Sequence, residues 1–365
     1  MVKILHCADV HLDSALTGRS KTAELRRQDI RDSFSAAVSL AVKQGVRLFL
    51  ISGDLFDNEA VSPHTLTFLK NEFLRADNIR FFICSGNHDC CGAASVYNYA
   101  DFPENVYVFK KDKIESVIIP EFNVCIYGAG STRPHNESRV LSGFHVENPE
   151  LINIMLFHGN LSGAAKENYS PLTAEDIKNS GLDYIALRHI HKFSGIEKLY
   201  NTYYAYSGCI EGRGFDETGE KGALIGNIGK GICALEFYPV CRRQYMSIQC
   251  SVDGLDDITR IKEAVTECLK KVDPKNLIRV TLTGVCSAEL INLKLLAADF
   301  ADRFFYFELR DKTREPAHVL NMPGKRTLTG IFLSSLEDED PEVTALAKKY
   351  AFSALSDQKE IDYED

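Results

Sequence analysis

Five short polar motifs, each directly after an apolar, strand-like run, constrain the fold of this 365-residue chain more than any other feature. In chain order they are Asp9-Val10-His11, Gly53-Asp54-Leu55-Phe56-Asp57, Gly86-Asn87-His88-Asp89, His158-Gly159-Asn160 and His189-Ile190-His191. Ligands of open α/β sheets bind at the edge formed by the carboxyl ends of the strands. We therefore expect the five motifs to converge on one site at such an edge.

The first hundred residues alternate between strand-like and helix-like segments. Apolar runs at residues 2–7, 46–52 and 80–85 predict strands. Between them, apolar residues recur at helical spacing up to Gly45 and again over residues 65–75. This βαβαβ rhythm predicts parallel strands joined by right-handed crossovers.

The rest of the chain predicts a second sheet and a second domain. From Val106 to Tyr238, short strands follow one another with no long helix, so we expect an α/β fold in which a β-sandwich is flanked by helices. After that the pattern starts afresh as a small α/β unit. We place the first domain at residues 1–243, the small C-terminal α/β domain at 244–333 and an acidic tail at 334–365.

The net charge and the cysteine content indicate which binding partners and which cellular compartment to expect. The net charge of -9 argues against a broad basic coat for nucleic acid, although bound divalent cations can supply positive charge locally. The eleven cysteines are scattered, as is typical of free thiols in a reducing cytosol. No apolar run approaches the length of about eighteen residues that a membrane span needs, so we expect a cytoplasmic protein.

The side chains of the five motifs supply carboxylate, amide and imidazole donors. This mixture suits two divalent metals, and because thiolate is absent from it, we expect Mn ahead of Fe or Zn. Asp54 is the candidate bridge, since two metals about 4 Å apart need a shared anionic ligand. Asn87 would hold a metal without adding charge, which leaves His88 free to protonate a leaving oxygen. The candidate ligands are Asp9, His11, Asp54, Asn87, His158, His189 and His191.

Each motif alone also has a purely structural explanation. Asp-x-His or Gly-Asp at a strand end is most often a polar turn. His189 and His191, two apart on a strand, also fit a half-exposed polar face, and Cys7, Cys90 and Cys91 are more simply packed thiols than metal ligands. The occurrence of all five motifs in this order favours a metal site over separate structural explanations.

The order of the motifs resembles that of the calcineurin-like metallophosphoesterase superfamily. Within it, residues 6–13 (HCADVHLD), 53–57 (GDLFD) and 186–192 (ALRHIHK) are similar to the DNA-repair exonuclease branch, the SbcD-type nuclease subunit. Residues 206–222 (YSGCIEGRGFDETGEKG) are similar to the glycine-rich segment of Firmicute-type members. The resemblance implies a four-layer metallophosphoesterase β-sandwich flanked by helices, with a small α/β cap domain that contacts DNA.

The resemblance also implies roles for individual residues. One metal would be held by Asp9, His11, Asp54 and His191, and the other by Asp54, Asn87, His158 and His189. His88 would be the general acid. The implied activity is hydrolysis of DNA phosphodiesters in DNA repair by a hydroxide that the two metals activate. The implied partners are DNA and an SbcC-type coiled-coil ATPase that docks on the C-terminal segment, and a homodimer stays open.

Arg188 departs from the family pattern, which usually has Gly before His-x-His. Turned toward the metals, its guanidinium would oppose metal loading, yet it could also reach a phosphate oxygen of DNA. Strand alternation favours the opposite orientation, in which Arg188 faces away from His189 and only covers the sheet. Arg213, in a glycine-rich loop that could fold back over the site, is the second candidate substrate contact.

Two other functions would use the same features. A phosphodiesterase or phosphatase for small nucleotides or phosphoproteins needs the same metal core, although the expected cap favours a polymer substrate. A catalytically weak scaffold that binds DNA or an ATPase would follow if Arg188 disables the site. Mn-dependent hydrolysis of a nitrophenyl phosphodiester, compared with that of single- and double-stranded DNA, separates these functions.

Overall fold

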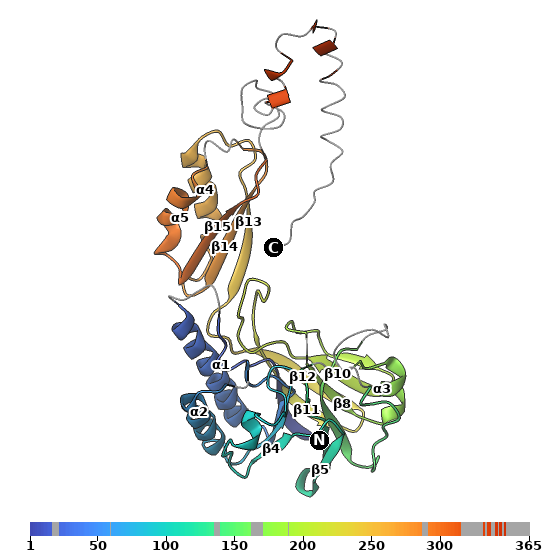
Figure 1. Cartoon of the computed structure of the whole chain (residues 1–365). Coiled ribbons are helices and arrows are strands. Elements are labelled where there is room, and N and C mark those ends of the chain that lie inside the picture. The colour runs from blue at the N-terminus through green and yellow to red at the C-terminus, as the bar shows by residue number, and fades with distance from the viewer. Residues whose placement is uncertain are drawn as a thin grey trace. The chain divides into compact units, whose positions relative to one another are not determined.

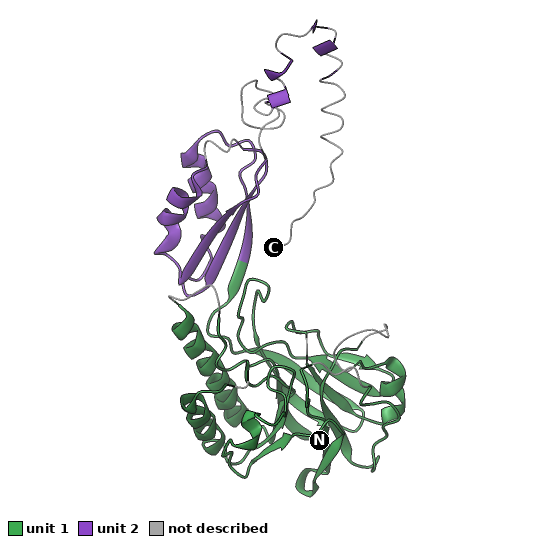
Figure 2. Cartoon of the chain, viewed as in Figure 1, with its two compact units in different colours: residues 1–246 green, residues 247–365 purple. Residues whose placement is uncertain are grey.

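The computed structural model of the chain forms two compact units, Met1–Met246 and Ser247–Asp365 (Figure 1, Figure 2). The structure describes residues 1–16, 22–58, 60–134, 139–161, 171–188, 190–286, 291–314 and, with gaps, 331–347. All five polar motifs belong to the first unit. The candidate site is therefore a property of that unit.

One six-stranded sheet of the first unit contains the strands that precede the first three motifs. Its strand order is β12-β11-β1-β2-β3-β4, and β1 to β4 run parallel. The strands are β1 (Val2–Cys7), β2 (Leu48–Ile51), β3 (Arg80–Cys84), β4 (Val106–Phe109), β11 (Gly222–Gly229) and β12 (Ile232–Pro239). Because β1, β2 and β3 are parallel neighbours, their carboxyl ends meet at one edge, which brings the first three motifs together.

The second six-stranded sheet carries the strands that precede the last two motifs. Its order is β5-β6-β7-β8-β10-β9, and β6, β7, β8 and β10 run parallel. The strands are β5 (Glu115–Ile119), β6 (Val124–Gly128), β7 (Ile152–His158), β8 (Tyr184–Arg188), β9 (Glu197–Leu199) and β10 (Thr202–Tyr206). The register of β7 and β8 pairs His158 with Arg188, so the last residues of these two strands lie side by side.

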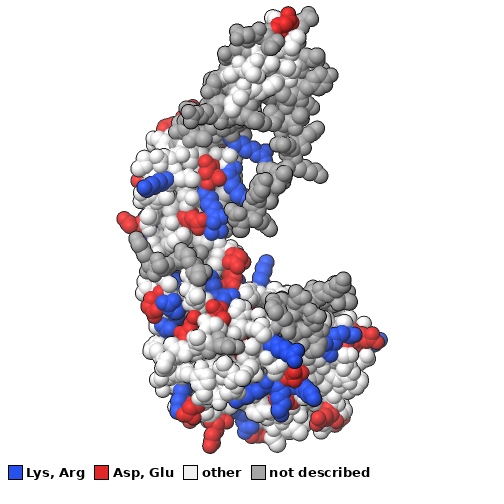
Figure 3. Space-filling view, in the orientation of Figure 1, with Lys and Arg blue, Asp and Glu red and all other residues white. Residues whose placement is uncertain are grey.

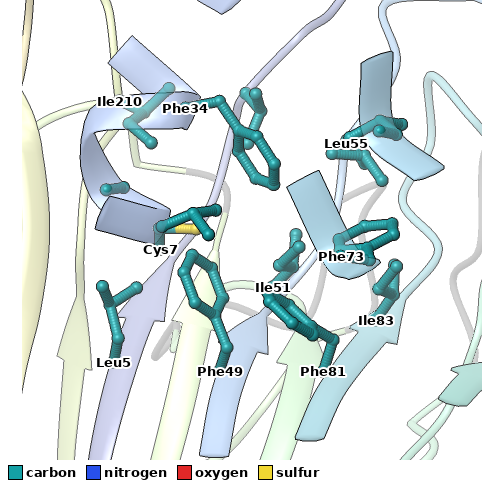
Figure 4. Close-up of a cluster of buried hydrophobic side chains, with 14 of the residues drawn as sticks. Leu5, Cys7, Phe34, Phe49, Ile51, Leu55, Phe73, Phe81, Ile83 and Ile210 are labelled. Carbon is teal, nitrogen blue, oxygen red and sulfur yellow. The ribbon is translucent and has the colours of Figure 1, made fainter. Parts of the chain in front are cut away.

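Two helices cover the outer face of the first sheet. They are α1 (Ala23–Gln44) and α2 (Pro63–Leu74). Figure 4 shows Phe34 of α1 and Phe73 of α2 packed against Phe49 and Phe81 of the sheet, with all four rings fully buried. Burying a phenylalanine side chain stabilises a fold by roughly 1.5–3 kcal/mol, so these contacts hold the helices on the sheet.

The two sheets of the first unit pack face to face. Ile4 of β1 and Leu50 of β2 belong to the same buried cluster as Ile154 of β7 and Ala186 of β8. A helix, α3 (Ala174–Ser180), packs on the outer face of the second sheet, where its Ile177 is buried. The resulting order of helix, sheet, sheet and helix confirms the predicted four-layer β-sandwich flanked by helices.

The second unit is a small α/β domain, which confirms the predicted fold of the C-terminal part. Its three-stranded sheet has the order β13-β14-β15, with β14 and β15 parallel. The elements are β13 (Tyr245–Ser251), α4 (Ile258–Cys268), β14 (Leu277–Thr283), α5 (Leu293–Ala301) and β15 (Tyr306–Asp311). Most of the acidic tail, including residues 337–339 and 348–365, lies outside the described residues. Among the described residues, no helix has the length and apolar character that crossing a membrane requires.

Candidate metal centre

Three of the predicted ligands lie on strained backbone just after β1 and β2. Asp9, His11 and Asp54 have φ angles of 50°, 51° and 45°, in the left-handed region that non-glycine residues rarely adopt. His11 N donates to Asp54 O at 3.0 Å, and Asp9 N donates to Gly53 O at 3.2 Å. Such strain costs about 1–3 kcal/mol a residue and persists only where the surrounding structure fixes it. Here these backbone bonds fix two turns whose side chains meet.

The side chains of Asp9, His11 and His191 form a group whose donor atoms all lie within 4.8 Å of one another. His11 Nε2 lies 3.5 Å from Asp9 Oδ1 and 3.7 Å from Asp54 Oδ2, and His191 Nε2 lies 3.5 Å from Asp9 Oδ1. Ligand atoms around a tetrahedral ion with bonds of about 2.1 Å are about 3.4 Å apart. Asp9 Oδ2 and His11 Nε2 are buried and have no hydrogen-bond partner in the described part of the chain. The group therefore fits one divalent ion.

Two carboxylates behind this group orient its histidines. Asp57 Oδ1 lies 2.9 Å from His11 Nδ1, and Glu217 Oε1 lies 2.6 Å from His191 Nδ1. Each contact leaves Nε2 of its histidine directed at the group. Arg213 joins the two carboxylates, because its Nη1 donates to Asp57 Oδ1 at 2.7 Å and its Nη2 lies 3.4 Å from Glu217 Oε1. Carboxylate partners of this kind fix the tautomer and raise the basicity of metal-ligating histidines.

The charges of this outer layer are set by its neighbours. Burial alone would raise the pKa of Glu217, but its contacts with His191 and Arg213 lower that pKa to about 2. Burial would likewise raise the pKa of Asp57, but its contact with His11 lowers that pKa to about 2. The hydrogen bond that His191 donates to Glu217 in turn raises the pKa of His191. Both carboxylates are therefore ionised at neutral pH. Glu217 is hydrogen-bonded to His191 Nδ1, whereas Asp57 lies at ion-pair distance from His11 Nδ1.

Glu217 was not predicted from the sequence, whereas Arg213 was predicted as a substrate contact. Glu217 lies in the glycine-rich loop, 26 residues after the histidine that it orients. Its side chain is only 5% exposed, and it also accepts the Arg213 backbone N–H at 2.7 Å. The structure thus gives Arg213 a place in the outer layer, and its contact with substrate stays a prediction.

The third motif is braced against the second by Asp89. Its Oδ1 accepts from Gly86 N at 2.6 Å and its Oδ2 accepts from Phe56 N at 3.2 Å, which ties the turn after β3 to the turn after β2. His88 N donates to Asp54 Oδ1 at 3.1 Å. The Gly-Asn-His-Asp turn is thereby held next to Asp54.

His88 lies at the mouth of the site. Its side chain is 41% exposed, its Nε2 is 3.8 Å from Asp54 Oδ2, and its Nδ1 is 3.1 Å from the backbone carbonyl oxygen of Asp57. His11, Asp54 and His88 form a second group whose spacing could hold a cation. A groove of about 330 Å³ opens here, lined by Ser14, Ala15, Leu16, Asp57, His88, Arg213, Gly214, Asp216 and Glu217. An exposed imidazole thus lies in a groove beside buried metal-type ligands.

Arg188, the last residue of β8, occupies the other half of the predicted centre. Its Nε donates to Asp9 Oδ1 at 2.6 Å, and its Nη2 is in contact with Asp54 Oδ2. Its Nη1 lies 2.9 Å from both Asn87 Oδ1 and His158 Nε2. Four of the predicted metal ligands therefore surround the guanidinium.

The inward orientation of Arg188 corrects the expectation that strand alternation turns it away from the site. Ala186, two residues earlier in β8, packs between the two sheets, and alternate residues of a strand share a face. The expectation inferred the face of Arg188 from that of His189, whereas among the described residues it is Ala186 that shares its face. His189 itself lies outside the described residues. His158, in register with Arg188 on the neighbouring strand, reaches the same space.

The two halves of the predicted centre therefore differ in what they can hold. The half formed by Asp9, His11 and His191, with Asp54 beside it, fits a divalent ion. The half formed by Asn87 and His158 does not fit a second ion as its side chains lie, because both residues already contact Arg188.

Comparison with known proteins places these motifs in a family. The model of the calcineurin-like phosphoesterase family matches residues 2–193, a range that includes every predicted ligand. The "Uncharacterized metallophosphoesterase YhaO" of Bacillus subtilis is 28% identical over 87% of this chain and 83% of its own length. Two proteins named "DNA double-strand break repair protein Mre11", from Thermoplasma acidophilum and Saccharolobus solfataricus, are 22% and 25% identical over 98% and 92% of this chain and 95% and 90% of theirs.

Proposed function

Because the chain belongs to the calcineurin-like phosphoesterase family, we propose that it is a metal-dependent nuclease that hydrolyses DNA phosphodiesters. The observation that supports this proposal is the group of Asp9, His11 and His191, beside Asp54, with His88 in the adjoining groove. A bound divalent ion, for which we propose Mn, polarises a phosphoryl oxygen and lowers the pKa of a water molecule. The remaining chemistry belongs to side chains of the chain itself.

His88 is the proposed general acid. Its Nδ1 lies beside the backbone carbonyl oxygen of Asp57, so Nδ1 donates there and Nε2 is the atom that gives up a proton from the imidazolium. The partly exposed position of the ring gives it access to a leaving oxygen in the groove. A positioned acid of this kind contributes about 100-fold to 10,000-fold to the rate.

DNA is proposed as the substrate because two of the relatives are named as proteins of DNA double-strand break repair. Figure 3 shows Lys and Arg interleaved with Asp and Glu on the visible described surface, in keeping with the net charge of -9. Phosphate binding at the centre, through a bound cation and nearby basic groups, would then replace a broad basic coat. The small α/β unit is the proposed cap that contacts DNA.

The test is hydrolysis of bis(nitrophenyl) phosphate and of single- and double-stranded DNA by the full-length chain in Mn. We expect activity on all three, and none in Asp54→Ala, because Asp54 is the carboxylate shared by the proposed ligand set. Hydrolysis of nitrophenyl esters and small nucleotides without any cleavage of DNA would replace this proposal with a small-nucleotide phosphodiesterase. Absence of hydrolysis on every substrate would favour a binding scaffold.

The proposed setting is the cytoplasm, and the proposed partner is an SbcC-type ATPase. None of the eleven cysteines, all of which lie among the described residues, is in a disulfide, which suits a reducing compartment. Deletion of residues 337–365 should leave nitrophenyl ester hydrolysis unchanged, because a charged terminal segment usually contributes little to a core. The same deletion should weaken co-purification with the ATPase. Equal co-purification of the full-length and truncated chains would remove the tail from this proposal.

A further inference from the structure

The guanidinium of Arg188 uses the acceptor atoms that a second ion would need. Its Nη1 lies 2.9 Å from Asn87 Oδ1 and from His158 Nε2, two predicted ligands of the second ion, and its Nε donates to Asp9 Oδ1, a predicted ligand of the first ion, at 2.6 Å. Nη1 is also in contact with His158 Nδ1, so whichever ring nitrogen carries the single lone pair of the neutral imidazole faces the guanidinium rather than an ion. Nη2 forms an ion pair with Asp54 Oδ2, an oxygen of the proposed bridging carboxylate.

The backbone around Arg188 leaves room for its aliphatic stem. A Cβ built at Gly53 would lie 3.0 Å from Arg188 Cδ and 3.2 Å from His158 Nδ1, tighter than ordinary contacts. The φ of 131° at Gly53 is also one that side-chain-bearing residues rarely adopt. Glycine at this position therefore permits the path that Arg188 takes. The Arg188 side chain is only 2% exposed.

The charge of Arg188 is compensated where it lies. A buried guanidinium is tolerated when carboxylates pair with it, and Asp9 and Asp54 supply two. A guanidinium is not deprotonated in proteins, so it cannot discharge to make way for an incoming ion. It is also covalently attached, so a metal would have to displace a cation that is always present.

We propose that Arg188 is the resident cation of the second metal position, so that this chain holds one exchangeable divalent ion and one fixed guanidinium. The catalytic part of this inference rests on the proposed phosphoesterase function, whereas the occupancy part does not. Guanidinium groups stabilise charge on a transferring phosphoryl group, as metal ions do. The substitution of Arg188 for the usual Gly therefore keeps positive charge beside the phosphate while lowering the demand for metal.

The number of Mn ions bound per chain tests this inference. Full-length wild type, Arg188→Gly and the control Arg133→Gly are stripped with chelator and titrated with Mn by calorimetry, with elemental analysis after desalting. Arg133 is an exposed loop residue, so its loss controls for removing an arginine. We expect one ion in wild type and in Arg133→Gly, and two ions in Arg188→Gly. The Mn dependence of ester hydrolysis should follow a single-site curve in wild type.

A second measurement follows stability rather than activity. In chelator, the thermal midpoint of Arg188→Gly should fall below that of wild type, because Asp9 and Asp54 lose the guanidinium that pairs with them, and Mn should restore it. Two ions or none in wild type would overturn the inference, as would a single ion in Arg188→Gly. If Arg188→Gly does not fold, the wild-type count decides alone. If wild type binds one Mn ion and Arg188→Gly binds two, but neither hydrolyses any substrate, the proposed function is refuted and the inference about occupancy stands.

Discussion

The half of the centre built on His11 and His191 differs from the half built on Asn87 and His158 in the source of its positive charge. In the first, ligand-type atoms lie 3.5 to 3.7 Å apart, a spacing that fits an external cation, although Asp9 Oδ1 and Asp54 Oδ2 also contact Arg188. In the second, the chain supplies its own cation through Arg188. The difference teaches that a metal-binding motif can keep its ligand residues while a neighbouring side chain, here that of Arg188, takes the position of a metal ion.

Asp9 couples the two halves. Its Oδ1 accepts from Arg188, while its Oδ2 is buried and has no hydrogen-bond partner within the described residues. Burial would raise the pKa of Asp9, but Arg188 and the neighbouring histidines hold that pKa well below its usual value. The carboxylate is therefore ionised, and its Oδ1 lies within hydrogen-bond distance of Arg188 and 3.5 Å from Nε2 of both His11 and His191, so the same oxygen belongs to both halves.

The largest effect that separates the halves is expected from a pair of histidine substitutions. His191→Ala should weaken Mn binding by at least about 100-fold, since loss of even an outer partner of a ligand costs about 10-fold to 100-fold. His158→Ala should keep one bound Mn, because its neighbour is Arg188 rather than the ion. Calorimetric titration of both variants measures this. Equal loss of Mn in the two would show that the halves are equivalent and break the comparison.

A smaller effect, on the rate alone, is expected at the mouth of the site. His88→Ala should lower kcat for nitrophenyl ester hydrolysis by about 100-fold or more while Mn affinity stays within a few-fold, because a general acid is lost and no ligand. Parallel measurement of kcat and of the dissociation constant for Mn checks this. If the variant lost its Mn as completely as His191→Ala, His88 would be a ligand, as its spacing from His11 and Asp54 also permits.

Behind the ion-holding half, Glu217→Gln should weaken Mn binding by about 10-fold, near the lower end of the range for outer partners, because the amide can still contact His191. Glu220→Gln is the matched control, since Glu220 is an exposed carboxylate of the same loop. The measurement is the dissociation constant for Mn of both variants against wild type. An unchanged affinity in Glu217→Gln would mean that orientation of His191 does not distinguish this half.

Most of the fold could be predicted because its elements are long or strongly patterned. The run Val2–Cys7 was predicted with the bounds that β1 has, and Gly45 ends α1 with the expected left-handed φ of 66°. The helix Ala174–Ser180 was not predicted, because seven residues show little periodicity. Its start is a capping box from Thr173 to Asp176, in which Asp replaces the usual Glu or Gln.

The site was less predictable than the fold, for two physical reasons. Glu217 is one of 51 acidic residues, and no spacing in the sequence distinguishes it, because a loop brings it to His191. The orientation of Arg188 depends on which face of β8 turns toward the other sheet, and that face is identified by the packing of Ala186 rather than by the sequence. Since a shift of one residue reverses the face of a strand side chain, inferring the face from His189 gave the wrong orientation.

His6 is a buried imidazole that should carry no charge. Its Nδ1 lies 2.8 Å from the Tyr184 hydroxyl, and its Nε2 lies 2.8 Å from the Ser52 hydroxyl. Burial lowers the pKa of His6 to about 3. A neutral His6 adds no positive charge near Asp9, so the fixed charge of this region comes from Arg188.

The smallest expected effect is the pH dependence that His6 gives to stability. An unfolded histidine binds a proton below about pH 6.5, whereas folded His6 does not until about pH 3, so acid favours the unfolded chain and stability falls as the pH drops between these values. Between pH 7 and pH 5.5 the free energy of unfolding should fall by about 1 kcal/mol because of His6. Urea unfolding of wild type and His6→Gln at both pH values measures it, because the variant lacks this titration and should lose about 1 kcal/mol less. An equal loss of unfolding free energy in both proteins, or an imidazole signal of His6 that titrates near pH 6.5 by NMR, would show that folded His6 accepts a proton.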